Sequence, residues 1–273
     1  MRPPARPGSA RDGLTAVIVR KSAAEIDKIA AAGVILADCL DALGEAAAPG
    51  VTTAELDRLA EKFIRRRKGV PTFLGYRGFP GSICSSPNDM VVHGIPGRYR
   101  VAEGDLLSID CGVTFDGYVA DSAVTLPMGA VEPEAQRLMD VTRESLEAGL
   151  AECREGRRLG DVSHAIQEVV EAAGFSVVRS LVGHGVGKEM HEDPQIPNYG
   201  DPGRGPRLEE GMVFAIEPMV DAGTHDVVVA DDGWAIHTAD GSLSAHFEHT
   251  VAVGKKGPRV LTRRSSERSG AGA

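Results

Sequence analysis

Four acidic residues interrupt stretches of this chain that are otherwise almost wholly apolar. They are Asp110, Asp121, Glu217 and Glu248. A buried carboxylate is costly unless it is paired with a cation or binds a metal ion. Four such acids in strand-like contexts therefore call for a shared counter-charge, which a pair of divalent ions would supply. For each acid taken singly, a neighbouring arginine or backbone amide is the alternative.

The first two acids lie on either side of the Asp116-Gly117 dipeptide, between two alternating apolar runs. Asp-Gly in this position predicts a tight β-hairpin. Counting outward from the turn pairs Gly112 with Asp121 and makes Asp110 a diagonal neighbour of Asp121 on the same face. Their backbones would then lie roughly 7 to 8 Å apart, and their side chains could hold ions about 3.5 to 4 Å apart. A bulge would spoil this geometry, and two solvated acids beside a turn are the alternative.

The segment from Gly183 to Pro194 carries two histidines, His184 and His191, among several glycines. It is too rich in glycine for a regular helix, so we expect a shaped loop. Two histidines on one loop can converge on a cleft, one as a metal ligand and one as a proton donor or oxyanion partner. An ordinary surface histidine is the alternative for each. The segment lacks the Gly-Lys-Ser/Thr ending of a phosphate loop, which argues against nucleotide binding.

These residues and their surroundings resemble the type I methionine aminopeptidases of peptidase family M24. The resemblance covers residues 22 to 261 and rests on the contexts Ser-Ile-Asp110-Cys-Gly, Ala-Asp121-Ser, Gly-His184-Gly-Val-Gly, Ala-Ile-Glu217-Pro-Met and Phe-Glu248-His-Thr. It implies an α+β pita-bread fold, with two pseudo-symmetric αβ halves around a dinuclear metal site. The short spacing between His184 and Glu217 leaves no room for the helical insert of the type II enzymes.

The resemblance also implies the ligand roles. Asp110 would bind one ion, while Asp121 and Glu248 would bridge both. His184 and Glu217 would complete the other ion, with Glu217 also placed to accept the proton of the attacking water. One imidazole among oxygen donors suits manganese, iron or cobalt and tolerates zinc, so the native metal stays open.

Substrate contacts follow from the same resemblance. His191 would stabilise the oxyanion or the leaving amide, and His93, in Val-Val-His93-Gly-Ile-Pro, would contact the peptide on the leaving side. The pocket for an unbranched apolar side chain would be lined by Phe73, Tyr76, Phe79, Cys84, Met190 and Trp234. Each of these six residues is otherwise an ordinary core residue.

The implied activity is removal of the initiator methionine from nascent polypeptides whose second residue is small and uncharged, by attack of a metal-bridged hydroxide. A proline-specific M24 aminopeptidase is an alternative, although such enzymes normally carry a large extra N-terminal domain. A non-catalytic pita-bread binding protein is the other. A contact with the ribosome near the peptide exit would have to be local. The basic run 65–68 could supply it, or could simply favour the dipole at a helix end.

Composition and terminal sequences complete the expectations. The 273 residues are 42% hydrophobic, enough for a sizeable core, and the net charge of −9 argues against broad nucleic-acid binding. The apolar runs fall short of the ~20 residues of a membrane span, and the N-terminus lacks a signal-peptide core. We therefore expect a cytoplasmic monomer. The four cysteines show no zinc or redox spacing, which predicts reduced thiols.

Element signals place one catalytic domain at residues 21–261 between disordered ends, 1–20 and 262–273. Capping boxes at Ser22 and Thr52 begin two helices, Pro133 opens a third, and a fourth runs from near Asp161 to Gly174.

Overall fold

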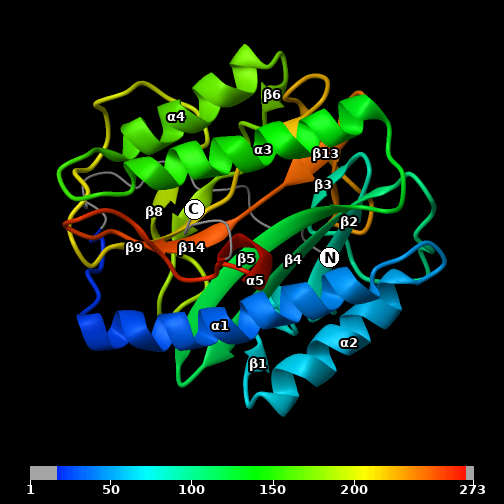
Figure 1. Ribbon diagram of the computed structural model, residues 1–273, viewed down its shortest axis with the longest axis horizontal. Helices are drawn as coiled ribbons and strands as arrows, with labels where there is room; N and C mark the ends of the chain where they lie inside the picture. Colours follow the sequence, from blue (N-terminus) through cyan, green and yellow to red (C-terminus); the bar gives the residue numbers. More distant parts are fainter. Residues whose placement is uncertain (1–16, 269–273) are drawn as a thin grey trace.

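The computed structural model describes residues 17–268. Two helix pairs, α1 with α2 and α3 with α4, lie on opposite sides of the strands in Figure 1. The helices are α1 (Ala23–Ala46), α2 (Thr53–Arg66), α3 (Pro133–Glu152), α4 (Leu159–Ala172) and α5 (Ser265–Arg268), with a 3-10 turn η1 at Tyr76–Gly78. Helix α1 packs on strands of the first half, and α3 packs on strands of the second.

The helix starts are set by local hydrogen bonds. Helices α1 and α2 begin with the predicted capping boxes, in which the Ser22 and Thr52 side chains each accept a backbone N–H three residues on. Helix α4 begins at Leu159, slightly earlier than predicted. The Asp161 carboxylate explains this, because it accepts the backbone N–H of Arg158 at 2.8 Å and satisfies the helix end from inside the first turn.

The first half is built on a long hairpin of β4 (Leu106–Phe115) and β5 (Tyr118–Pro127), flanked on β4 by β1 (Val70–Pro71) and β2 (Ile83–Pro87). Asp116 and Gly117 both have positive φ, +48° and +76°, as a two-residue type I′ turn requires. The register pairs Gly112 with Asp121 without a bulge. The predicted hairpin and its diagonal pair of acids are therefore confirmed.

The second half contains a five-stranded sheet in the order β15-β14-β9-β7-β8 and a three-stranded sheet in the order β13-β10-β6. A further small sheet, β11-β12-β3, lies beside them. The strands are β3 (Met90–Val92), β6 (Ser176–Val177), β7 (Gly183–Gly185), β8 (Glu192–Ile196), β9 (Val213–Ile216), β10 (Met219–Asp221), β11 (Val227–Val229), β12 (Ile236–Thr238), β13 (Ser244–His246), β14 (His249–Ala252) and β15 (Arg259–Val260).

Both glutamates of the predicted site lie where a strand pair is interrupted. Strands β9 and β14 pair up to Ile216 opposite His249, and pairing resumes between β10 and β13 with Met219 opposite His246. Glu217 and Glu248 fall in this interval. Pro218 helps to explain the break, because proline cannot donate a ladder hydrogen bond. The strand-like run around Glu248 is therefore two strands, β13 and β14, with Glu248 between them.

Hydrogen bonds between β5 and residues 248–250 join the two halves directly. The Ser122 hydroxyl donates to the Glu248 carbonyl at 2.6 Å, and the Glu248 N–H donates to the Ala123 carbonyl at 3.0 Å. Thr250 exchanges two hydrogen bonds with the Asp121 backbone, at 2.8 and 2.9 Å. These bonds hold the backbones of Asp121 and Glu248 next to one another.

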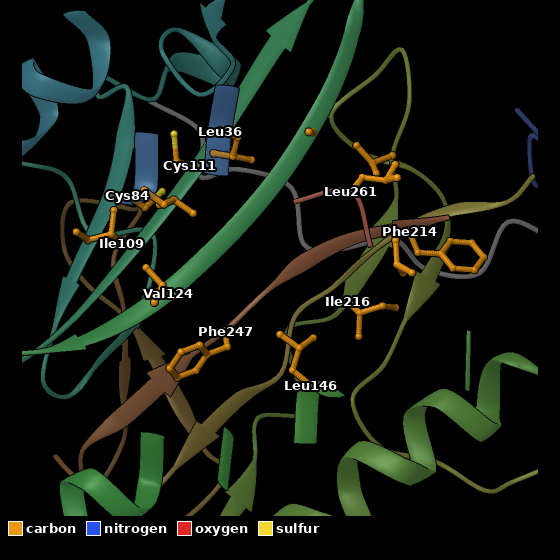
Figure 2. Packing of buried hydrophobic residues seen from close by; sticks show 14 of the residues in the cluster. Leu36, Cys84, Ile109, Cys111, Val124, Leu146, Phe214, Ile216, Phe247 and Leu261 are labelled. Carbon is orange, nitrogen blue, oxygen red and sulfur yellow. The ribbon is translucent and has the colours of Figure 1, made fainter. Parts of the chain in front are cut away.

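A continuous apolar core also connects the two halves. Buried residues of both halves belong to one cluster, and Figure 2 shows Leu36 and Cys111 from the first half with Leu146 and Ile216 from the second. Cysteines 39, 84, 111 and 153 are all buried and unbridged, in agreement with the expected reduced thiols.

The chain after residue 261 is more ordered than the sequence suggested. Thr262 is fully buried and its hydroxyl lies 2.9 Å from His249 Nδ1, while Glu267 of α5 lies 3.4 Å from His249 Nε2. The disordered tail expected from residue 262 therefore does not describe residues 262–268. The disorder expected over residues 1–20 likewise does not describe residues 17–20, where Arg20 pairs with Glu209 at 2.8 Å. Residues 1–16 and 269–273 lie outside the described residues. Within residues 17–268, no helix combines the length and apolarity needed to cross a membrane.

Candidate metal centre and substrate pocket

The five predicted ligands border one cavity of about 360 Å³. One ligand atom each from Asp121, His184 and Glu248 lie within 4.8 Å of one another. His184 Nε2 is 3.7 Å from Asp121 Oδ2 and 3.5 Å from Glu217 Oε1. Asp110 faces the same cavity as the diagonal neighbour of Asp121 on the hairpin. Residues far apart in sequence thus form one side of the cavity, which we call the acidic floor: Asp110, Asp121, His184, Glu217 and Glu248.

Electrostatics make this floor unfavourable without a cation. Burial raises the pKa of the Asp110 carboxyl to about 7. Burial also raises the pKa of Asp121, Glu217 and Glu248, and the neighbouring carboxylates raise each further. Carboxyl groups that crowd one another in a desolvated site cannot all ionise unless positive charge joins them.

The floor also has hydrogen-bonding capacity left over. Among residues 17–268, Asp110 Oδ1, Asp121 Oδ1 and Glu248 Oε1 are buried without a hydrogen-bond partner. Buried polar atoms normally have one, so these three oxygens need another kind of partner. Oxygen donors around one imidazole match the coordination preferences of divalent transition metals. The residues therefore fit a divalent metal centre.

The His184 imidazole is neutral at neutral pH, as a metal ligand must be. Burial lowers its pKa to about 4, so Nε2 can offer a lone pair at neutral pH. Its Nδ1 lies 2.9 Å from the Gly185 carbonyl. A proton on Nδ1 would donate to that carbonyl and leave Nε2 free to bind a metal, as metal-binding histidines usually do.

His191 and His93 reach the cavity from turns. The His191 ring lies 4.2 Å from the His184 ring, and its Nδ1 is 2.9 Å from the Tyr76 hydroxyl. Burial, with the neighbouring His184, lowers the His191 pKa to about 3. His93 follows β3 with a φ of +61°, a conformation that costs a non-glycine residue of order 1–3 kcal/mol and is often found at functional sites.

The six predicted pocket residues all line the same cavity: Phe73, Tyr76, Phe79, Cys84, Met190 and Trp234. Phe79 and Trp234 meet edge to face at 5.1 Å. Arg77 lies over the Tyr76 ring, 5.3 Å from its centroid. The result is an apolar wall above the acidic floor. Its role in holding a methionine side chain stays a prediction.

Sequence reasoning missed some of the surroundings. The loop predicted over 183–194 contains two short antiparallel strands, β7 and β8, and His191 lies in the turn between them. Residues 187–191 between the two strands are irregular, as predicted for a non-helical segment. The other omission is His246, which is buried with its Nε2 4.0 Å from Glu217 Oε2. Its position two residues before Glu248 in a strand-like run was the available signal, because alternate strand residues share a face.

Two αβ halves that place four carboxylates and a histidine in one cavity define a metal-dependent hydrolase of the pita-bread type. The model of metallopeptidase family M24 matches residues 27–255, and the chain belongs to this family.

Comparison with individual proteins gives the same result. The chain is 53% identical over 247 residues to a methionine aminopeptidase of Clostridium acetobutylicum, covering 90% of this chain and 99% of that one. The crystal structure of methionine aminopeptidase from Thermotoga maritima superposes with a TM-score of 0.89 at 45% identity, covering 91% of this chain and 100% of that one. A prolidase from Pyrococcus furiosus, at 21% identity and a TM-score of 0.71, shares the fold, with 91% of this chain matching 66% of that one. The predicted family and fold are confirmed.

Proposed function

We propose that this chain is a metal-dependent aminopeptidase that removes the N-terminal methionine from newly made proteins. The single observation that carries the proposal is a cavity with an acidic, histidine-containing floor and an apolar wall, in a chain of family M24. Relatives at about half identity over most of the chain are methionine aminopeptidases, which supports the same activity here.

We propose that two divalent ions occupy the floor. Asp121 and Glu248 would bridge them, Asp110 would hold one, and His184 with Glu217 the other. The three buried oxygens without hydrogen-bond partners among residues 17–268 support this ligand set. Bound ions of this kind lower the pKa of a water to near neutrality and polarise a scissile carbonyl. Manganese, iron, cobalt and zinc are the candidate metals.

The protein's own residues would handle protons and substrate. Glu217 lines the cavity, so it would serve both as a ligand and as the carboxylate that accepts a proton from the attacking water. His191 would stabilise the developing oxyanion or the leaving amide, with its ring held by the Tyr76 hydroxyl. His93 would contact the peptide on the leaving side of the bond.

The composition of the pocket supports the proposed preference for methionine. Met190 is buried at 6% exposure and adds a flexible thioether to an aromatic wall, and such surfaces pack well against a second thioether. We infer that Phe73, Tyr76, Phe79, Cys84 and Trp234 complete this wall around the substrate side chain. A small, uncharged second residue is expected from the family resemblance.

The remaining expectations concern where the protein acts. We propose a monomer that works on nascent chains in the cytoplasm. A ribosome contact through residues 65–68 stays a prediction, and part of this basic run has other partners. Arg65 pairs with Glu61 at 2.8 Å, and Arg67 pairs with Asp38 at 3.0 Å.

The test combines metal stoichiometry with substrate selectivity. Chelated protein titrated with manganese in a calorimeter should bind two ions, and the loaded protein should release methionine from Met-Ala-Ser but not from N-acetylated Met-Ala-Ser. Equal release from both peptides would contradict an aminopeptidase. Full activity with one bound ion would contradict the two-ion centre.

A further inference from the structure

Lys21 is a buried lysine just before helix α1, remote in sequence from the residues that line the cavity. Its side chain is only 5% exposed, and its Nζ lies 2.7 Å from Glu192 Oε2 and 3.2 Å from the Val19 carbonyl. Its backbone N–H donates to the Gly211 carbonyl at 2.7 Å. Lysine is almost never buried unless it is paired, so this ion pair is a built feature and not a chance surface contact.

The second oxygen of Glu192 closes the turn between β7 and β8. Glu192 Oε1 accepts the backbone N–H of Lys188 at 2.9 Å and that of Glu189 at 3.3 Å. One carboxylate therefore ties the buried ammonium to the backbone of the turn. Charge-assisted hydrogen bonds of this kind are roughly twice as strong as neutral ones.

Gly187 shows how closely the turn packs on this ion pair. A Cβ on Gly187 would lie 2.6 Å from Glu192 Oε1 and 2.7 Å from Lys21 Cε. Its carbonyl also accepts the backbone N–H of Val119 at 2.7 Å. The turn is thus attached to the long hairpin at its beginning and to Lys21 near its end.

The same turn carries Met190 and His191 into the cavity. Two contacts define the position of His191 there: its ring lies 4.2 Å from that of His184, and its Nδ1 lies 2.9 Å from the Tyr76 hydroxyl. A displacement of about 1 Å at such a group can cost on the order of 100-fold in rate. The turn therefore needs a rigid attachment.

We propose that Lys21 and Glu192 are positioning residues, whose buried ion pair fixes the turn 187–192 and thereby sets the places of His191 and Met190 in the substrate pocket. This inference rests on the proposed function. Neither residue is a metal ligand or lines the cavity, so the pair acts through the turn.

The test compares Lys21→Met with Lys21→Arg and with a matched control, Arg20→Met. Arg20 is the neighbouring residue and forms an ion pair of similar length with Glu209, 2.8 Å, but its side chain is 53% exposed. Each variant is assayed for kcat and KM on Met-Ala-Ser, for manganese affinity by calorimetry, and for hydrogen exchange of the Lys188 and Glu189 amides.

Lys21→Met should lower kcat by about 100-fold, because the turn loses its attachment. Manganese affinity should stay within about twofold, since the proposed metal ligands lie outside the turn, while the Lys188 and Glu189 amides should exchange at least tenfold faster. Lys21→Arg should recover most of the rate, because it keeps the charge and the hydrogen-bond donors. Arg20→Met should match the parent protein in all three measurements.

Wild-type kcat in folded Lys21→Met would overturn the inference. Manganese affinity that falls in parallel with kcat would also overturn it, because the pair would then support the whole centre. If Lys21→Met does not fold, Glu192→Gln takes its place. This variant keeps an oxygen for the turn amides and removes the charge opposite Lys21. An unchanged kcat in Glu192→Gln would therefore overturn the inference. Should the parent release no methionine, the proposed function fails, and the exchange rates alone decide whether the pair holds the turn.

Discussion

The acidic floor and the apolar wall of the cavity are built in different ways. The floor residues lie on or between paired strands, and hydrogen bonds from β5 to residues 248–250 fix the backbones of Asp121 and Glu248. The wall residues lie mainly on turns. Tyr76 begins a 3-10 turn, and Met190 lies in the turn between β7 and β8. His93 and His191, beside the wall, also lie outside the strands.

This difference separates two requirements. A metal centre needs several oxygens at fixed mutual distances, and paired strands supply that rigidity. The substrate pocket is assembled from turns, each held by a few side-chain contacts, so one substitution can displace a pocket residue and leave the metal centre in place. Substitutions in the floor should therefore act on metal binding, and substitutions in the wall should act on turnover with the metal still bound.

The largest effect is expected in the floor. Glu248→Gln and Asp110→Asn should abolish metal loading, and kcat should fall by more than the ~1000-fold that loss of one oxyanion donor costs. Without metal, Glu248→Gln should unfold at a higher temperature than the chelated parent at neutral pH, because it removes one of several crowded, buried carboxyl groups. Metal analysis and thermal unfolding check both parts. Full activity in either variant would end the proposed ligand set.

The next effect is expected beside the wall, at His191. His191→Ala should lower kcat by about 100- to 1000-fold, the cost of a lost hydrogen bond in the transition state. Metal content should not change. Steady-state kinetics together with metal analysis separates the two regions, and the comparison breaks if His191→Ala loses its metal.

A smaller effect should follow from removing the contact that orients His191. Tyr76→Phe deletes the hydroxyl 2.9 Å from His191 Nδ1 and keeps the ring that stacks on His191. A hydrogen bond is worth about 0.5–1.5 kcal/mol, so kcat should fall by about 2- to 13-fold. In the His191→Ala background the same change should have almost no further effect. Additive losses would show that Tyr76 acts independently of His191.

The smallest effect on activity is expected at Asp221, a buried acid outside the metal centre. Burial raises its pKa to about 7, and the Ser244 hydroxyl opposes this rise only in part. A raised folded-state pKa gives stability that is present in acid and lost as pH rises through about 7. Asp221→Asn should therefore stabilise the protein at about pH 8, by up to ~1.4 kcal/mol for each pH unit between the unfolded and folded pKa.

At about pH 4 the gain should nearly vanish, because the wild-type carboxyl is then protonated in the folded state. Urea unfolding at both pH values measures the difference, and Asp231→Asn, at an exposed position, is the control. Methionine release should be unchanged. A gain of equal size at both pH values would mean that Asp221 is not a buried titrating group.

Much of the floor could be predicted because its signals are local. The Asp-Gly turn fixes the register of a regular hairpin, so the relation between Asp110 and Asp121 follows by counting residues. The capping boxes of α1 and α2 are equally local. Glu217 and Glu248 were identifiable as acids in apolar runs. The interruption of strand pairing at which both residues lie was not, because it depends on pairing between distant segments.

The parts that were missed depend on distant contacts. Residues 262–268 look like a polar tail, yet Thr262 is buried against His249 of strand β14. The attachment of the turn 187–192 depends on Lys21, more than 160 residues earlier in the chain. Charged residues in polar sequence contexts give no local sign that they will pair in the interior.

Cleavage of Met-Ala-Ser and Ala-Pro-Ala by chelated enzyme, with manganese, cobalt, iron or zinc added back, tests the central claim most directly. The account predicts that methionine is released only after a metal is restored, and that Ala-Pro-Ala stays intact. Release of alanine before proline would favour a proline-specific aminopeptidase, and failure to cleave either peptide with any of the four metals would contradict an enzymatic role for this cavity.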